Sequence, residues 1–186
     1  MTWWEEAQRS IVAAARMARF DAGGIAGFNL TLDGFWRSFG AAVLVLPFAM
    51  LLARDSDPEM AAMSWAGWGV DYVISWIAFP VAMVWVSRLL GITGRYATFI
   101  IAYNWSSVVQ IGVLFLLQLL HTIGLLTGEL QALVLLLAYL YLLGYSVFVA
   151  RVAAGVPWLT ASGLVALDLA LSLALLRGVA ALFPGA

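Results

Sequence analysis

The feature that most constrains this chain is an almost unbroken apolar sequence over residues 35–183, which joints divide into five pieces. A helix needs about 20 apolar residues, at about 1.5 Å of rise each, to cross the hydrocarbon core of a bilayer. Five segments reach that length, at about residues 35–53, 68–90, 97–120, 130–149 and 158–182. In lipid each segment must satisfy its own backbone hydrogen bonds. The sequence therefore predicts an all-α polytopic membrane protein with five transmembrane helices.

Composition argues against several classes of function. Hydrophobic residues make up 65% of the 186 positions and charged residues only 10%, whereas about 25% of the residues of a soluble domain are charged. Most of the chain is therefore expected to lie in lipid. The absence of cysteine excludes disulfides and thiolate metal sites. A net charge of −1, without a block of basic residues, indicates no nucleic-acid partner.

The arginines predict the orientation of the chain. All nine basic residues are Arg, which we interpret as the bias of a high-GC bacterial genome. Basic residues are enriched in cytoplasmic loops, and seven of the nine fall on one side of the predicted bundle: Arg9, Arg16, Arg19, Arg37, Arg88, Arg95 and Arg151. We expect a multi-pass protein of the bacterial inner (cytoplasmic) membrane, with the N-terminus cytoplasmic and the C-terminus periplasmic. The joint that holds Asp57 and Glu59 would then be a solvated periplasmic loop.

Residues 3–20 predict an amphipathic helix before the first span. At 100° per residue one face is apolar and the other charged: Trp4, Ala7, Ile11, Ala14, Ala15 and Ala18 against Glu5, Arg9 and Arg16. Two positions are open, an interfacial helix on the inner leaflet or a cap on the cytoplasmic ends of the bundle. Gly23, Gly24 and Gly27 predict a hinge after it. The chain thus divides into an N-terminal region, residues 1–34, and a transmembrane domain, residues 35–186.

Polar residues form a stripe along the third segment. Within about 60° of Ser107 on a helical wheel lie Tyr103, Asn104, Gln110, Gln118 and His121. Such a face must point into the bundle or toward another protein, because lipid offers amide groups no partners. The stripe is either a polar path or ligand groove, or a set of interhelical hydrogen bonds. We favour hydrogen bonding.

Asp168 is predicted to be the only carboxylate deep inside a span. It lies ten residues after Trp158, about 15 Å along a helix and close to the bilayer midplane. Depth along each span predicts a midplane cluster of Asp168 with Ser107, Gln110, Tyr139 and Tyr141. The cluster is either a proton or cation site or a polar clamp between helices. The clamp is favoured because no second acid or basic partner accompanies Asp168.

The last segment has a row of small residues at intervals of four: Ser162, Ala166, Ala170, Ala174 and Gly178. Small residues at this spacing let helix backbones approach closely. The row therefore predicts a helix-packing face. Its neighbour is either another span of this chain or a second copy.

The sequence predicts no enzyme. Catalysis needs a set of cooperating groups, and the single His121 lacks an HExxH spacing. Neither a phosphate-binding loop nor a dinucleotide fingerprint occurs. A lipid-modifying enzyme with His121 or Asp168 as base would lack a second catalytic group. We expect no catalytic residue, no cofactor and no bound metal.

Three short motifs resemble the Yip1 family of small five-span membrane proteins. Residues Asp33, Gly34, Phe35 and Trp36 stand where that family has an acidic and aromatic motif, although its following proline is absent. Gly144, Tyr145 and Ser146 resemble its Gly-Tyr-Ser motif, and Leu90, Gly91 and Gly94 resemble its glycine-containing inner loop. Eukaryotic members of the family act in vesicle trafficking through binding partners. The resemblance implies a scaffold or interaction role.

Our leading expectation is a non-catalytic scaffold or accessory subunit that binds protein or lipid partners, with a protein partner or a homo-oligomer as the assembly. The N-terminal helix and the small-residue row would form the contacts. The alternative is a small transporter or channel, in which Asp168 and the polar stripe line a midplane path. An inverted repeat, which would favour transport, is not evident in the sequence.

Overall fold

The computed structural model describes residues 2–56 and 63–184, with side chains omitted at 54–56. Within these residues the fold is all-helical, apart from one isolated β-bridge between Met63 and Pro184. Five helices are long and apolar enough to span a membrane, which confirms the five predicted spans. They are α2 (Leu32–Ser38) with α3 (Gly40–Ser56), α5 (Trp65–Leu89), α6 (Tyr96–Thr122), α7 (Gly128–Ala154) and α8 (Trp158–Leu182). The predicted loop with Asp57 and Glu59 lies outside the described residues.

The first span is divided at Phe39, where the sequence predicted one continuous helix. Trp3, at the start of α1 (Trp3–Ala18), packs on this junction, and its indole N–H donates to the carbonyl of Arg37 at 3.3 Å. A Cβ atom on Gly40 would lie 2.6 Å from the Trp3 ring. Glycine at this position therefore lets α1 reach the start of α3.

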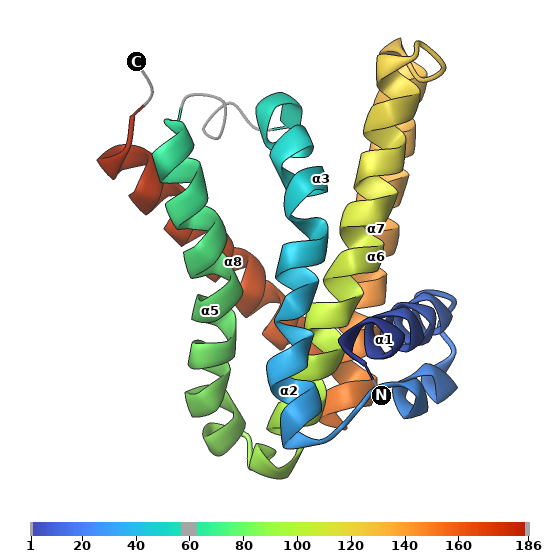
Figure 1. Ribbon diagram of the computed structural model, residues 1–186, viewed down its shortest axis with the longest axis vertical. Coiled ribbons are helices and arrows are strands. Elements are labelled where there is room, and N and C mark those ends of the chain that lie inside the picture. Colours follow the sequence, from blue (N-terminus) through green and yellow to red (C-terminus); the bar gives the residue numbers. More distant parts are fainter. Residues whose placement is uncertain (1, 57–62, 185–186) are drawn as a thin grey trace.

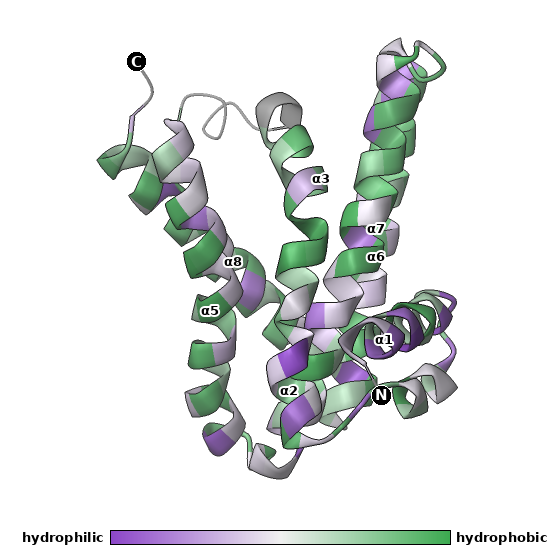
Figure 2. Cartoon of the chain, in the orientation of Figure 1, coloured by the Kyte–Doolittle hydropathy of each residue, from purple (hydrophilic) through white to green (hydrophobic). Residues whose placement is uncertain are grey.

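The helices form two pairs with α3 between them (Figure 1). Helices α6 and α7 make an antiparallel hairpin, and α8 packs against both α7 and α5. Helix α1 lies against the side of α6 and α7, nearer to the end of the bundle where α5 ends and α6 begins (Figure 1). We call that end the α1 end, and the opposite end, where α3 ends and α5 begins, the far end. Figure 2 shows apolar colouring over most of the spans and hydrophilic residues gathered in α1 and α2.

The core is divided unequally between the two ends. The larger cluster of buried side chains fills the α1 end and includes Ala14, Met83, Trp105, Phe148 and Leu164. A smaller cluster joins α3, α5 and α8 at the far end, and includes Ala53, Trp68, Leu176 and Val179. Among the described residues this smaller cluster has no member from α6 or α7. The two parts of the bundle therefore separate toward the far end.

Helix α1 is part of the main core. Its buried side chains are Glu6, Ala7, Ser10, Ala13, Ala14, Met17 and Ala18, a face that differs from the predicted apolar one: Trp4 is 56% exposed and Ile11 is half-buried. Tyr145 of α7 donates to the carbonyl of Ala14 at 2.9 Å, and Tyr141 donates to that of Ala18. Helix α1 therefore packs through one face against the side of the bundle, near the middle of α7 and toward its C-terminal part. The interfacial position, the cap on the cytoplasmic ends and the division at residue 34 stay predictions.

The predicted glycine hinge is a short 3₁₀ helix, η1 (Ala22–Gly27), packed against α1. A Cβ atom on Gly24 would lie 2.7 Å from the Ala13 carbonyl oxygen, and one on Gly27 would lie 2.7 Å from the Ala13 Cβ. Neither glycine has a positive φ. These two glycines permit close packing of η1 on α1.

Candidate functional site

A large cavity lies at the far end, between the separated helix pairs. Its volume is about 870 Å³, and it is bounded by α3, α5, α6 and α7. It extends from the far end of the bundle to Ile111 and Tyr139, which lie about 16 Å along α6 and α7 from the ends of those helices. We call it the far-end cavity. It is lined by Ala49, Leu52, Ala53, Trp68, Asp71, Tyr72, Ile111, Leu114, Leu117, Gln118, His121, Thr122, Leu126, Gln131, Leu135 and Tyr139.

Asp71 is the carboxyl group of the far-end cavity. It is the seventh residue of α5, about 9 Å from Trp65 along the helix. The side chain is only 6% exposed, and its Oδ1 has no hydrogen-bond partner in the described part of the chain. Asp71 is therefore a second buried carboxyl group within a predicted span, which the candidate residues from the sequence did not include. The sequence signal for its position inside the helix is Ser64. The Ser64 side chain accepts from the Gly67 N–H and caps α5, so the helix begins at Trp65, three residues before the predicted span.

Aromatic rings flank Asp71 along α5. Trp68 and Tyr72 stack with ring centroids 5.3 Å apart and planes 20° apart, and both line the cavity. The Tyr72 hydroxyl donates to the Ala42 carbonyl of α3 at 2.6 Å. This bond and the smaller core cluster hold α5 against α3. The position of Asp71 in the wall is therefore set by packed neighbours on both sides of it.

The opposite wall comes from α6 and α7. Its apolar part is Ile111, Leu114, Leu117, Leu126 and Leu135. Its polar part includes Gln118, Gln131 and His121, whose Nδ1 lies 2.9 Å from the Leu126 carbonyl oxygen. Since a carbonyl only accepts, Nδ1 carries the hydrogen in this contact. Two predicted stripe residues, Gln118 and His121, thus lie in the wall of a cavity.

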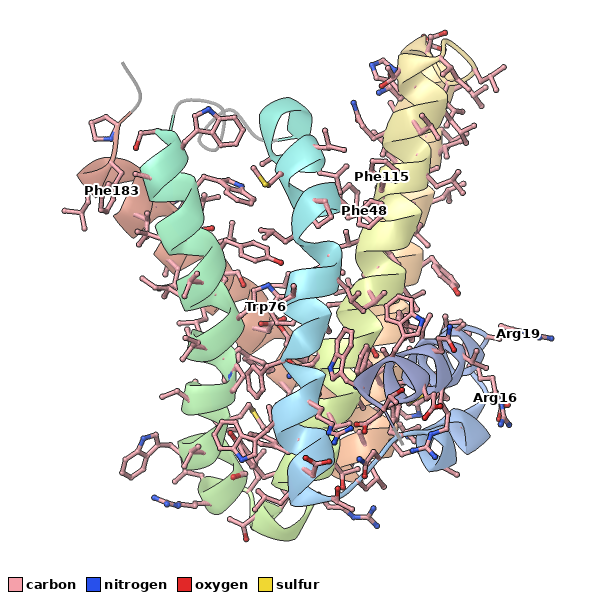
Figure 3. All side chains as sticks on the ribbon, in the orientation of Figure 1. Arg16, Arg19, Phe48, Trp76, Phe115 and Phe183 are labelled. Atoms are coloured by element: carbon pink, nitrogen blue, oxygen red, sulfur yellow. The ribbon has the colours of Figure 1, made fainter. Side chains whose placement is uncertain are left out.

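The lower limit of the gap between α3 and α6 is an aromatic contact. Phe48 of α3 and Phe115 of α6 meet edge to face with centroids 4.9 Å apart, as Figure 3 shows. Trp76 lies further along α5, between α5 and α3 in that view, and packs against the main core. The far-end cavity extends past the level of this contact, to Ile111 and Tyr139.

Asp168 lies in a second, much smaller cavity. The Tyr103 hydroxyl donates to its Oδ1 at 2.9 Å, which joins α6 to α8. The cavity measures about 20 Å³, enough for about one water molecule. Ser106, Gln110 and Ser146 share its wall with Asp168 and Tyr103. The chemistry available here is hydrogen bonding between helices around a single carboxyl group.

The structure brings together only part of the predicted midplane cluster. Gln110 and Asp168 line the same small cavity, whereas Ser107 donates to the Tyr103 carbonyl of its own helix at 3.2 Å. Tyr139 lies in the far-end cavity and Tyr141 against α1. Equal depth along two helices does not make two side chains neighbours, because each points in its own direction around its helix.

The polar stripe of α6 divides among several neighbours. Asn104 is fully buried and donates to the Ser38 hydroxyl of α2 at 2.9 Å, while Tyr103 bonds α8. Gln110 accepts from Ser146 of α7 at 3.5 Å. The part of the stripe nearest the α1 end therefore forms interhelical hydrogen bonds, and the part nearest the far end lines the far-end cavity.

The small-residue row of α8 is exposed. This holds for all five members: Ser162, Ala166, Ala170, Ala174 and Gly178. A Cβ atom on Gly178 would meet nothing within 4 Å. The row therefore has no packing partner among the described residues of this chain, and its role as a helix-packing face stays a prediction.

Comparison with known proteins does not assign the chain to a family. No protein-family model, no curated protein and no solved structure matches it. Within the described residues, no three His, Cys, Asp or Glu side chains gather as a metal-ligand set. Two residues of the short sequence motifs make contacts between helices. The ring centroids of Phe35 and Tyr96 lie 5.9 Å apart, and the Tyr145 hydroxyl donates to the Ala14 carbonyl of α1. Function is therefore argued from the far-end cavity.

Proposed function

We propose that this chain is a non-catalytic membrane protein that binds a lipid or another amphipathic molecule in the far-end cavity, as a scaffold or accessory subunit. The supporting observation is the cavity itself, about 870 Å³ with an apolar wall, one buried carboxyl group and several amide and hydroxyl groups. Binding sites of small molecules measure about 300–1,000 Å³ and combine apolar walls with a few polar groups. A scaffold that holds such a molecule needs no catalytic set.

We place the α1 end in the cytoplasm of a bacterium and the far end in the periplasm. The seven arginines named above belong to α1, its C-cap, α2, the end of α5, η2 (Thr93–Arg95) and the last turn of α7, all at the α1 end. Cytoplasmic enrichment of basic residues supports this orientation. The far-end cavity then opens toward the periplasmic leaflet.

Native mass spectrometry of the protein extracted in mild detergent tests this function. The wild type should carry a bound molecule of lipid-like mass. The Ala49→Trp variant, which places an indole in the cavity, should lose it, whereas Val73→Trp, on the exposed side of α5, should keep it. Retention by Ala49→Trp would exclude the far-end cavity as the binding site. A stoichiometric protein subunit in the same spectra would instead identify the partner of an accessory subunit.

A small transporter is the second candidate, and Asp168 is the observation that favours it. Carboxyl groups inside membrane spans often mark transport pathways, and Asp168 lines a small cavity with Gln110 and Ser146. Solute or proton flux into liposomes that depends on Asp168 would support this function. Absence of flux with a molecule still bound in the far-end cavity would favour the scaffold.

A further inference from the structure

The far-end cavity has an uncompensated acidic character. Among the described residues that line it, Asp71 is the one carboxyl group, and none is Arg or Lys. Its Oδ1 is buried without a hydrogen-bond partner in the described chain. A buried ionised carboxylate is strongly disfavoured unless a cation or a hydrogen-bond donor pairs with it. The partner that Asp71 Oδ1 lacks among the described residues is therefore a positively charged or N–H-donating group.

The rings beside Asp71 suit a positive charge as well. Trp68 and Tyr72 precede and follow Asp71 on α5, and both line the cavity. Ammonium groups and similar ligand cations are attracted to the faces of Trp and Tyr rings. One carboxyl group with two aromatic rings forms a cation site on a single helix wall.

The opposite wall suits a hydrophobic body. Leucine and isoleucine side chains of α6 and α7 form it: Ile111, Leu114, Leu117, Leu126 and Leu135. A compact inorganic cation would leave this wall without contacts, and an anionic head group would be repelled by Asp71. The two walls together require a ligand that is apolar and positively charged.

We propose that the far-end cavity binds a lipophilic cation, with its charge at Asp71 beside the stacked rings of Trp68 and Tyr72 and its hydrophobic body against α6 and α7. This inference rests on the proposed function and names its ligand class. The charge of the ligand forms an ion pair with the buried carboxylate of Asp71, and the cavity volume of about 870 Å³ accommodates the body.

Binding of radiolabelled tetraphenylphosphonium to the full-length protein in nanodiscs tests the proposal, with empty nanodiscs subtracted. We expect saturable binding that is at least about 10-fold tighter than that of neutral triphenylphosphine oxide. Asp71→Asn should weaken it by about 30-fold or more, because it removes the buried charge that pairs with the ligand. Glu129→Gln removes a carboxylate at the same end that does not line the cavity, and should leave binding unchanged.

Each outcome is decisive even where a variant fails to fold. Equal affinity of the wild type for the cation and the neutral analogue would overturn the lipophilic-cation proposal without any variant. So would full binding by a folded Asp71→Asn protein. If one of these two outcomes is found and a lipid-like molecule still copurifies with the wild type and is lost in Ala49→Trp, the lipophilic-cation inference fails but the proposed binding function stands. Loss of tetraphenylphosphonium binding in Ala49→Trp, which keeps Asp71, would support both.

Discussion

The role of a residue in this bundle depends on what the neighbouring helix offers it, a hydrogen-bond donor or open space. Asp168 and Asp71 show this contrast, since Asp168 accepts a hydrogen bond from Tyr103 and the Oδ1 of Asp71 has no partner in the described chain. One carboxyl group therefore joins two helices and the other faces a cavity. The two groups should respond differently to substitution.

We expect Tyr103→Phe to lower the free energy of unfolding by about 1–2 kcal/mol, because it removes the donor to Asp168. The loss should largely disappear in an Asp168→Leu background, where no acceptor remains. Unfolding in SDS of the two single variants and the double variant measures the coupling. Additive losses would show that the 2.9 Å contact contributes no stability of its own.

At Gly34 the space available for a side chain determines the effect of a substitution. A Cβ atom there would lie 2.0 Å from the Asn29 carbonyl oxygen. We expect Gly34→Ala to destabilise the protein by about 1–3 kcal/mol through overpacking. Gly112→Ala is the control, because its Cβ would meet nothing within 4 Å, and it should be neutral or stabilising by up to about 1 kcal/mol. Thermal unfolding of both variants in detergent tests the contrast, and equal stability would contradict it.

At the scale of elements, α1 is ordered by its junction with η1 as well as by the bundle. Arg16 and Asp21 form a salt bridge at 2.7 Å, and Asp21 also accepts from the Gly23 N–H. Between them Phe20 adopts a positive φ of 58° and places its ring edge to face against Phe148, 5.3 Å away. The chain reverses here, and η1 returns along α1.

The hydrogen bond from Arg16, aided by the Gly23 N–H, holds the pKa of Asp21 below its ordinary value of 3.8. Because the folded-state pKa is the lower one, this contact stabilises the junction above pH 3.8 and is lost as pH falls through the lowered pKa. The carboxyl ¹³C shift of Asp21 should therefore titrate with a midpoint below 3.8, and Arg16→Gln should raise that midpoint. Arg9→Gln should leave it unchanged. An unchanged midpoint in Arg16→Gln would contradict the assignment of the cause.

The whole molecule is a bundle that is packed at the α1 end and open at the far end. The main core joins α1 to the spans, whereas the smaller core leaves the far ends of α6 and α7 apart from α3 and α5. This difference between the ends creates the cavity. The arginines at the α1 end are the basis of the proposed direction across the membrane, with the α1 end cytoplasmic and the cavity at the other end.

Cysteine accessibility tests that direction, since the native chain has no cysteine. Leu125→Cys lies in the exposed turn between α6 and α7, and Thr93→Cys in exposed η2 at the α1 end. In spheroplasts an impermeant maleimide should label Leu125→Cys at once and Thr93→Cys only after permeabilisation. The reverse pattern would place the far-end cavity on the cytoplasmic side.

The sequence by itself determined that the described chain has five helices long and apolar enough to span a membrane. Each apolar segment has the length of a span, and backbone in lipid satisfies its hydrogen bonds by forming a helix. It also indicated which residues of α6 share a face, because helical periodicity is local. The tertiary structure alone decided which neighbour each of them meets: Asn104 meets α2, Tyr103 meets α8, and His121 lines a cavity. It also decided that one face of α1 is buried against the spans and that Asp71 lies in the wall of the far-end cavity. Those outcomes depend on the angles and spacing between helices, which packing of the whole chain sets and no single segment encodes.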